Sequence, residues 1–156
     1  MESTATVNAP IATATPLTPA LRRMFIAAAA YTFLGLLAGL FYRTLTHSRD
    51  FTEPTMLSIT HTHLLALGTL VSLIVLVLER LFTLSQSRAF RWFEFLYHGG
   101  LLVSVAAMMT RGTLQVVATN PTSPALPGIA GLGHIALTAG FVLLFIALGK
   151  ALRRIG

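Results

Sequence analysis

The sequence predicts an all-α integral membrane protein, a four-helix bundle of up-down-up-down topology, and two observations carry this prediction. The first is composition: of 156 residues, 54% are hydrophobic and only 10% are charged, and the mean hydropathy is +0.76. A soluble domain carries roughly 25% charged residues, because water has to wet its surface. The second observation is the spacing of the charges, which leaves four long apolar runs.

Each apolar run is long enough to cross a bilayer as a helix. A hydrocarbon core of about 30 Å needs about 20 apolar residues, and backbone groups in lipid must be paired within their own segment. The third run contains Glu94 near its start, and the Pro-rich stretch 120–127 separates it from the fourth. We expect one domain, residues 21–156, with helices at about 24–43, 55–80, 92–112 and 128–150.

The ends and loops of the chain predict its orientation. Residues 1–20 are small, polar and Pro-containing, which indicates a disordered tail and not a signal peptide. One side of the bundle would carry eight basic residues and the other side three. Basic loops stay in the cytoplasm, so we expect both termini there, in a multi-pass protein of the bacterial cytoplasmic (inner) membrane. Because the basic residues flank apolar runs, the net charge of +6 indicates membrane orientation and not nucleic acid binding.

Two histidines are expected at the same depth in the bundle. His61 and His134 lie about six residues inside the outer ends of the second and fourth predicted helices, which is roughly 10 Å below the surface. Level imidazoles on facing helices suit the axial ligation of a haem iron. We therefore expect a b-type haem held by His61 and His134. The alternatives are an interhelical hydrogen bond, another metal, or a proton pathway. The chain has no cysteine, which excludes thiolate metal sites and iron–sulfur clusters.

A third histidine competes with His61 for this role. His61 and His63 are two positions apart, so about 200° of helical rotation separates them and both cannot face one site. His61 shares a stripe with small and polar residues, Gly68 and Ser72 among them, which favours it as the inward ligand. An alignment of the second helix with the fourth on their Leu-rich ends favours His63 instead. His63 could also contact a propionate, bind a second metal or lie at an interface.

Other polar residues have weaker assignments. Tyr42 and Arg43 end the first helix and Arg111 ends the third, where they could bind haem propionates or act as ordinary interfacial anchors. His98 is expected near the inner surface, too far from the other histidines to share their iron, in a structural role. His47 is expected to be a solvated loop residue.

The segment SITHTHLLALGTL, residues 58–70, resembles the low-spin haem helix of the haem–copper oxidase and nitric oxide reductase superfamily. This resemblance implies that His61 ligates haem b near the outer face, and that His63 stands where those proteins have Asn. The whole chain, from YTFLGLLAGLFYR through HTHLLALGTL to GIAGLGHIALT, is similar to a family of small four-helix bacterial membrane proteins of unknown function. The oxidases also hold copper with three histidines, a cluster that this sequence does not offer, so oxygen reduction by this chain alone is not expected.

The function predicted from the sequence is that of a membrane b-type haem protein with bis-His ligation, acting in electron transfer or redox sensing without stand-alone catalytic activity. One alternative is a non-enzymatic accessory or assembly subunit of a larger respiratory complex. Another is a metal or proton carrier that uses His61, His63 and His134. A homodimer is plausible, because four short helices leave much of their surface uncovered.

Overall fold

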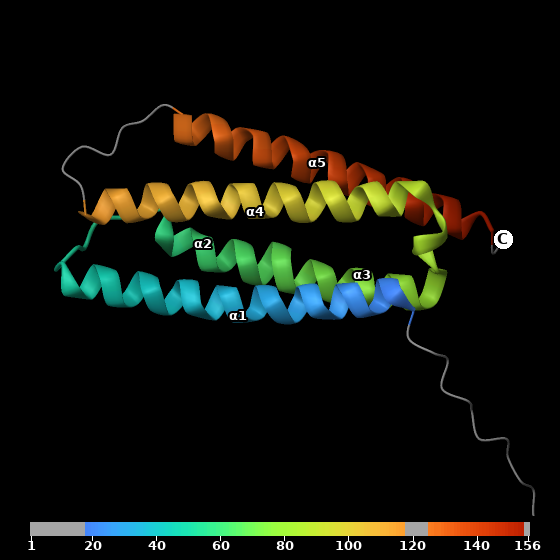
Figure 1. Ribbon diagram of the computed structural model, residues 1–156, viewed down its shortest axis with the longest axis horizontal. Coiled ribbons are helices and arrows are strands. Elements are labelled where there is room, and N and C mark those ends of the chain that lie inside the picture. The colour runs from blue at the N-terminus through green and yellow to red at the C-terminus, as the bar shows by residue number, and fades with distance from the viewer. Residues whose placement is uncertain (1–17, 118–124, 155–156) are drawn as a thin grey trace, which may run out of the picture.

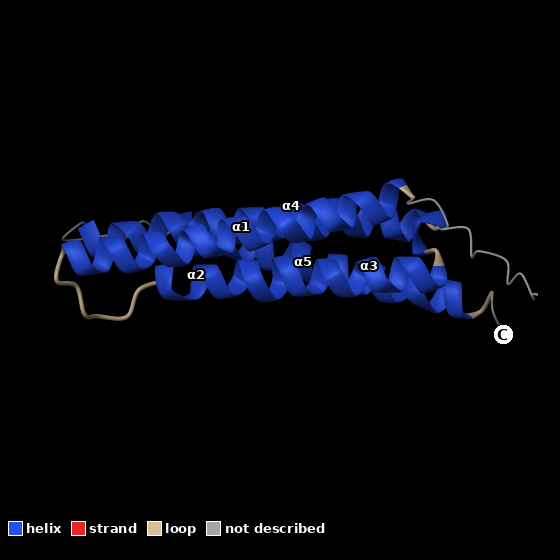
Figure 2. Ribbon diagram, turned by 90° about the horizontal axis from the view of Figure 1, so that it is seen from below, coloured by secondary structure: helices blue, strands red, loops and turns tan. Residues whose placement is uncertain are grey.

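The computed structural model describes residues 18–117 and 125–154, and in this part of the chain every regular element is helical (Figures 1 and 2). Four helices are long and apolar enough to cross a membrane. The first is α1 (Pro19–Ser48), the third is α4 (Arg88–Val117) and the fourth is α5 (Ala125–Leu152). The second consists of α2 (Leu57–His63), the π-helical segment η1 (Leu64–Leu70) and α3 (Val71–Phe82). The short 3-10 helix η2 (Leu84–Gln86) joins it to α4.

The four predicted helices are confirmed, but most of them extend beyond their predicted ends. The first begins at Pro19, five residues before the expected start, because Thr18 caps it: the Thr18 hydroxyl accepts a hydrogen bond from the Leu21 N–H at 3.3 Å. Proline at the start of a helix needs no partner for its nitrogen, which fits Pro19. Residue 18 therefore caps the helix and residues 19 and 20 are helical, and the rest of the predicted tail, residues 1–17, lies outside the described residues.

Consecutive helices run in opposite directions, and each packs against the next across the bundle in the order α1, second span, α4, α5 (Figure 1). The most extensive packing joins α4 to α5. It depends on Gly100 and Gly133, because a Cβ on Gly100 would lie 2.7 Å from the Gly133 carbonyl oxygen. Small residues let membrane helices approach closely in this way. At the beginning of α5 the packing ends, and Gly128 and Gly131 have no atoms within 4 Å of the position of a Cβ.

The π-helical segment is stabilised from a neighbouring helix. The wide turn of a π-helix disturbs the regular pairing of backbone carbonyls. In η1 the Leu67 carbonyl accepts a hydrogen bond from the Tyr97 hydroxyl of α4 at 2.8 Å, and Tyr97 is fully buried. On the other side of the segment, Thr69 and Thr32 of α1 share a hydrogen bond at 3.0 Å. These contacts hold η1, and with it the end of α2, against both neighbouring helices.

Polar contacts close one end of the bundle. Arg23 of α1 binds Glu94 of α4, with a nitrogen–oxygen distance of 2.8 Å. Glu79 is almost fully buried at the end of α3, where its carboxylate accepts hydrogen bonds from the backbone N–H and the hydroxyl of Ser85.

The outward faces of the helices carry large exposed apolar side chains, such as Phe33 and Ile135. Such faces suit a lipid environment.

Candidate functional site

Two histidine side chains meet between the second and fourth spans. His63 is the last residue of α2, and His134 lies in the first half of α5. Their ring centres are 6.4 Å apart, and the ring planes make an angle of 77°. The helix starts place His63 about 9 Å inward from Leu57 and His134 about 14 Å inward from Ala125, at 1.5 Å per residue. The two imidazoles therefore lie well inside helices that are long enough to cross a membrane, not in a loop.

The backbone fixes which ring nitrogen of each histidine is free. The Nδ1 atom of His63 lies 3.2 Å from the Ile59 carbonyl oxygen, and that of His134 lies 2.8 Å from the Ala130 carbonyl oxygen. A carbonyl oxygen only accepts hydrogen bonds, so in both rings Nδ1 carries the hydrogen and donates it. The Nε2 atom of each neutral ring then keeps its lone pair. An imidazole whose other nitrogen is hydrogen-bonded in this way is oriented as a metal ligand.

The separation of the rings fits a shared metal ion. Metal–imidazole bonds are about 2 Å long, so two imidazoles that bind one ion from opposite sides have ring centres about 6 Å apart. The observed separation between His63 and His134 is 6.4 Å. The lone pair of each Nε2 atom lies in the plane of its ring, so binding one ion from opposite sides also requires both ring planes to contain the line between the two Nε2 atoms. The rings stand edge to face, and one of them would have to turn to meet this condition. The pair offers two ligands, and in the described part of the chain no group of three or more His, Asp or Glu side chains comes together.

His61 does not lie beside His134, contrary to the expected pairing. Its ring stacks on that of Tyr42 in α1, with centres 6.5 Å apart and planes 13° apart. It also lies over Gly39, whose Cβ position is 3.8 Å from the His61 side chain. The stripe of small residues that favoured His61 does mark a packed face, but this face packs on α1: Gly68, one of its members, lies against the ring of Tyr31.

The three residues expected to contact propionates lie toward the end of the bundle where α1 ends and α2 begins. Tyr42 contacts His61, as described above. Arg111 is half-buried in α4 and precedes Gly112, which packs on the first residue of α2, Leu57. That level is about 9 Å outward from His63, at 1.5 Å per residue. Propionate binding by these residues stays a prediction.

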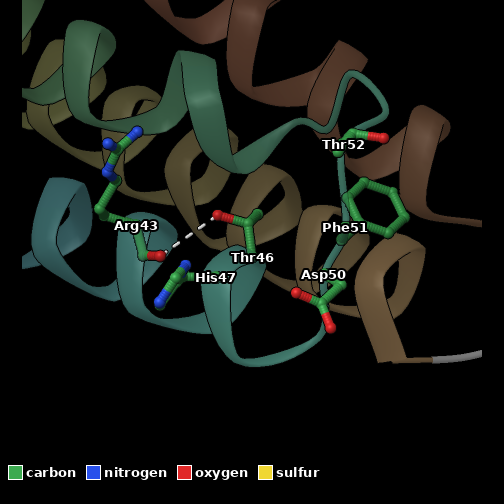
Figure 3. Close-up of a pocket in the computed structure, with 6 residues that line it drawn as sticks. All are labelled: Arg43, Thr46, His47, Asp50, Phe51 and Thr52. Carbon is green, nitrogen blue, oxygen red and sulfur yellow. Dashed lines mark hydrogen bonds between the residues drawn. The ribbon is translucent and has the colours of Figure 1, made fainter.

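Arg43 lines a hollow of about 260 Å³ at the end of α1 (Figure 3). The loop residues Asp50 and Phe51 contribute to the same hollow, and the Arg43 side chain points away from Asp50 in this view. His47, expected in a solvated loop, lies instead in the last turn of α1 and lines the hollow as well. The hollow therefore brings together two basic side chains and one carboxylate.

His98 lies deeper than the sequence indicated. Because α4 begins at Arg88, His98 is about 15 Å inside the helix and not close to its inner end. Its Nδ1 atom is 3.0 Å from the hydroxyl oxygen of Tyr31, and the two rings stack with centres 5.6 Å apart. This contact joins α4 to α1 and agrees with the expected structural role. Tyr31 and Tyr97 were not among the expected site residues, although tyrosines in the middle of apolar helices need hydrogen-bond partners.

Comparison with known proteins identifies one protein family. Residues 21–151 match a family described as a protein of unknown function. No curated protein and no solved structure shows significant similarity to the chain. The family match covers all four helices and both histidines of the pair, and it brings no activity with it.

Proposed function

We propose, on the premise that this chain belongs to the DUF2871 family of proteins of unknown function, that it is a b-type haem protein of the membrane. His63 and His134 would hold the haem iron, and the haem would serve electron transfer or redox sensing. The observation that carries the proposal is the pair of imidazoles with centres 6.4 Å apart, each with Nδ1 bonded to a carbonyl and Nε2 free.

The number of ligands favours haem over a bare metal ion. A porphyrin supplies four of the six ligands of its iron, so two histidines complete the set. Protein zinc sites, by contrast, take three or four ligands from the protein. His63 and His134 are a pair within the described residues, which is what a haem requires.

His134 lies on an open face of the described residues. It is exposed there, and beyond its own helix no described atom lies within 4 Å of the Cβ position of Gly131, one turn earlier. An imidazole on a membrane helix that faces lipid directly is energetically costly. A ligand bound at Nε2 that covers this face would remove that cost.

The chain's own residues hold and orient the ligands. The Ile59 and Ala130 carbonyls fix the tautomers of the two rings, and the Tyr97–Leu67 hydrogen bond fixes the segment that follows His63. A bound haem would supply reversible one-electron chemistry at the iron. With both axial positions filled by histidine, this arrangement suits electron transfer more than the binding of O₂ or NO.

The distribution of charge supports an orientation for the protein. The start of α1, the α3–α4 junction and the end of α5 lie at one end of the bundle (Figure 1). This end carries eight basic residues, against three at the other end. By the positive-inside rule, the basic end faces the cytoplasm of a bacterium, and the His63–His134 pair lies toward the outer side of the inner membrane.

Absorption spectra of the protein purified from haem-replete cells test the proposal. We expect a low-spin b-type spectrum that sharpens on reduction with dithionite, with one haem per chain. His134→Ala should lose this spectrum, and His47→Ala, a histidine variant remote from the pair, should keep it. Protein that is free of haem, or that carries stoichiometric zinc or copper in its place, would contradict the proposal and favour an accessory subunit or a metal carrier.

A further inference from the structure

The basic end of the bundle carries an exposed cluster of two arginines and two aromatic side chains. Arg88, Arg91, Trp92 and Phe95 all lie on the first two turns of α4 and line one shallow hollow of about 420 Å³. The rings of Trp92 and Phe95 meet edge to face, with centres 6.1 Å apart. These residues are three or four positions apart, so they share one helix face. We call them the Arg–Trp cluster.

Among the described residues, no carboxylate forms an ion pair with the arginines of the Arg–Trp cluster. Within residues 18–117 and 125–154, the ion pair is Arg23–Glu94, and neither Arg88 nor Arg91 has a carboxylate partner. Arg154 of α5 is different, because its guanidinium binds the Gln86 side chain and the backbone carbonyls at the end of α3. A guanidinium group can donate two parallel hydrogen bonds to the oxygens of one phosphate. Two such groups side by side therefore suit the binding of an anion.

The polarity of the Arg–Trp cluster changes along the helix axis. Phe95 lies about 10 Å farther into the bundle than Arg88, at 1.5 Å per residue. Trp92 lies between them, and tryptophan favours the level of the lipid headgroups. The indole and the phenyl ring are 59% and 70% exposed, so they offer an apolar surface directly below the two cations. A ligand that matches this order has a phosphate at one end and an apolar portion next to it.

We propose that the Arg–Trp cluster is a binding site for an anionic phospholipid, with the phosphate on Arg88 and Arg91 and the upper part of the acyl chains on Trp92 and Phe95. The shared chemistry is that of a phosphate anion, and free phosphate is the other source of it. The aromatic surface below the arginines favours the lipid. This site is independent of the histidine pair and of any haem.

The chain contains a single tryptophan, Trp92, which reports on the site directly. The full chain is reconstituted in phosphatidylcholine vesicles that contain either brominated phosphatidylglycerol or brominated phosphatidylcholine, and the quenching of Trp92 fluorescence is compared. Each basic residue near the membrane surface strengthens the binding of anionic lipid by about five-fold. We therefore expect a preference of about five-fold or more for phosphatidylglycerol at the Trp92 position. Equal quenching by the two lipids would overturn the proposal.

Matched variants separate this site from the general attraction of a basic surface. Arg88→Gln with Arg91→Gln should abolish the preference, whereas the corresponding lysine variants should keep part of it. Arg80→Gln with Arg153→Gln removes the same charge at the end of α3 and just after α5, outside the cluster, and should leave the preference intact. An equal loss in both glutamine pairs would show general attraction and refute the site. Inorganic phosphate at constant ionic strength should not displace the lipid, and displacement would assign the site to free phosphate.

Discussion

The ring of His63 lies edge to face with that of His134, and the centres of the two imidazoles are 6.4 Å apart. They come from the second and fourth spans, which α4 separates in the chain, and each ring is oriented by a hydrogen bond to the carbonyl four residues earlier in its own helix. The local backbone thus orients each ligand, and the packing of the helices sets the distance between them. A change in the local hydrogen bonds should alter the orientation of the rings, and a change in helix packing should alter the distance between them.

Tyr97→Phe should weaken the bundle around η1. The variant removes the hydroxyl that donates to the Leu67 carbonyl and leaves that buried acceptor without a partner. The loss of such a partner costs about 1–3 kcal/mol. Thermal unfolding in detergent measures the effect, with Tyr42→Phe as the control, since Tyr42 contacts His61 through its ring. An equal change in stability for both variants would contradict a specific role for Tyr97.

Gly100→Leu should separate α4 from α5. A side chain at Gly100 would meet the Gly133 carbonyl and the Ala136 methyl group at less than 3.0 Å, whereas the neighbouring Gly99 has no atom within 4 Å of its Cβ position. Overpacking of this kind costs about 1–3 kcal/mol. Because α5 carries His134, the variant should also lower haem content, while Gly99→Leu should match the unmodified protein in both measurements. Tolerance of leucine at both positions would mean that α4 and α5 do not pack through Gly100.

Glu79→Ala should loosen the connection between α3 and α4. The Glu79 carboxylate accepts the Ser85 N–H at 2.8 Å and also binds its hydroxyl, and Thr83 between them has a positive φ of 50°. Removing the acceptor should lower the free energy of unfolding by about 1–3 kcal/mol. The neighbouring exposed residue provides the control, and Arg80→Ala should change stability by less than about 0.5 kcal/mol. Limited proteolysis of the connection gives a second readout, and similar cleavage in both variants would argue against the role of Glu79.

The sequence was sufficient to predict the helices, because apolar runs bounded by charges have few other solutions in a membrane. It was less informative about their ends. The third helix was expected to begin after Arg91, yet it begins at Arg88, and charged residues are accommodated in its first turns, where Glu94 pairs with Arg23. The π-helical segment was not predictable, because it depends on a hydrogen bond from Tyr97, 30 residues farther along the chain.

The sequence predicted that histidines of the second and fourth helices come together, and the structure places His134 beside His63 of the second helix. That this pair binds haem stays a prediction. Which histidine of the second helix faces α5 was not predicted, because periodicity identifies a packed face without identifying the helix that packs on it. His61 lies on the face toward α1, against Gly39 and Tyr42, and His63 points to α5. Resemblance to the oxidase helix favoured His61 as well, and it carried no information on how α5 is placed in this bundle.

Comparison of His63→Ala with His61→Ala tests the central claim most directly. The two residues are two positions apart on the same helix, and the substitutions remove the same side chain. Both variants are purified from haem-replete cells, and their oxidised and dithionite-reduced spectra are recorded at equal protein concentration. The account predicts that His63→Ala loses the low-spin haem spectrum and that His61→Ala retains it. Loss in His61→Ala with retention in His63→Ala, or retention in both, would contradict it.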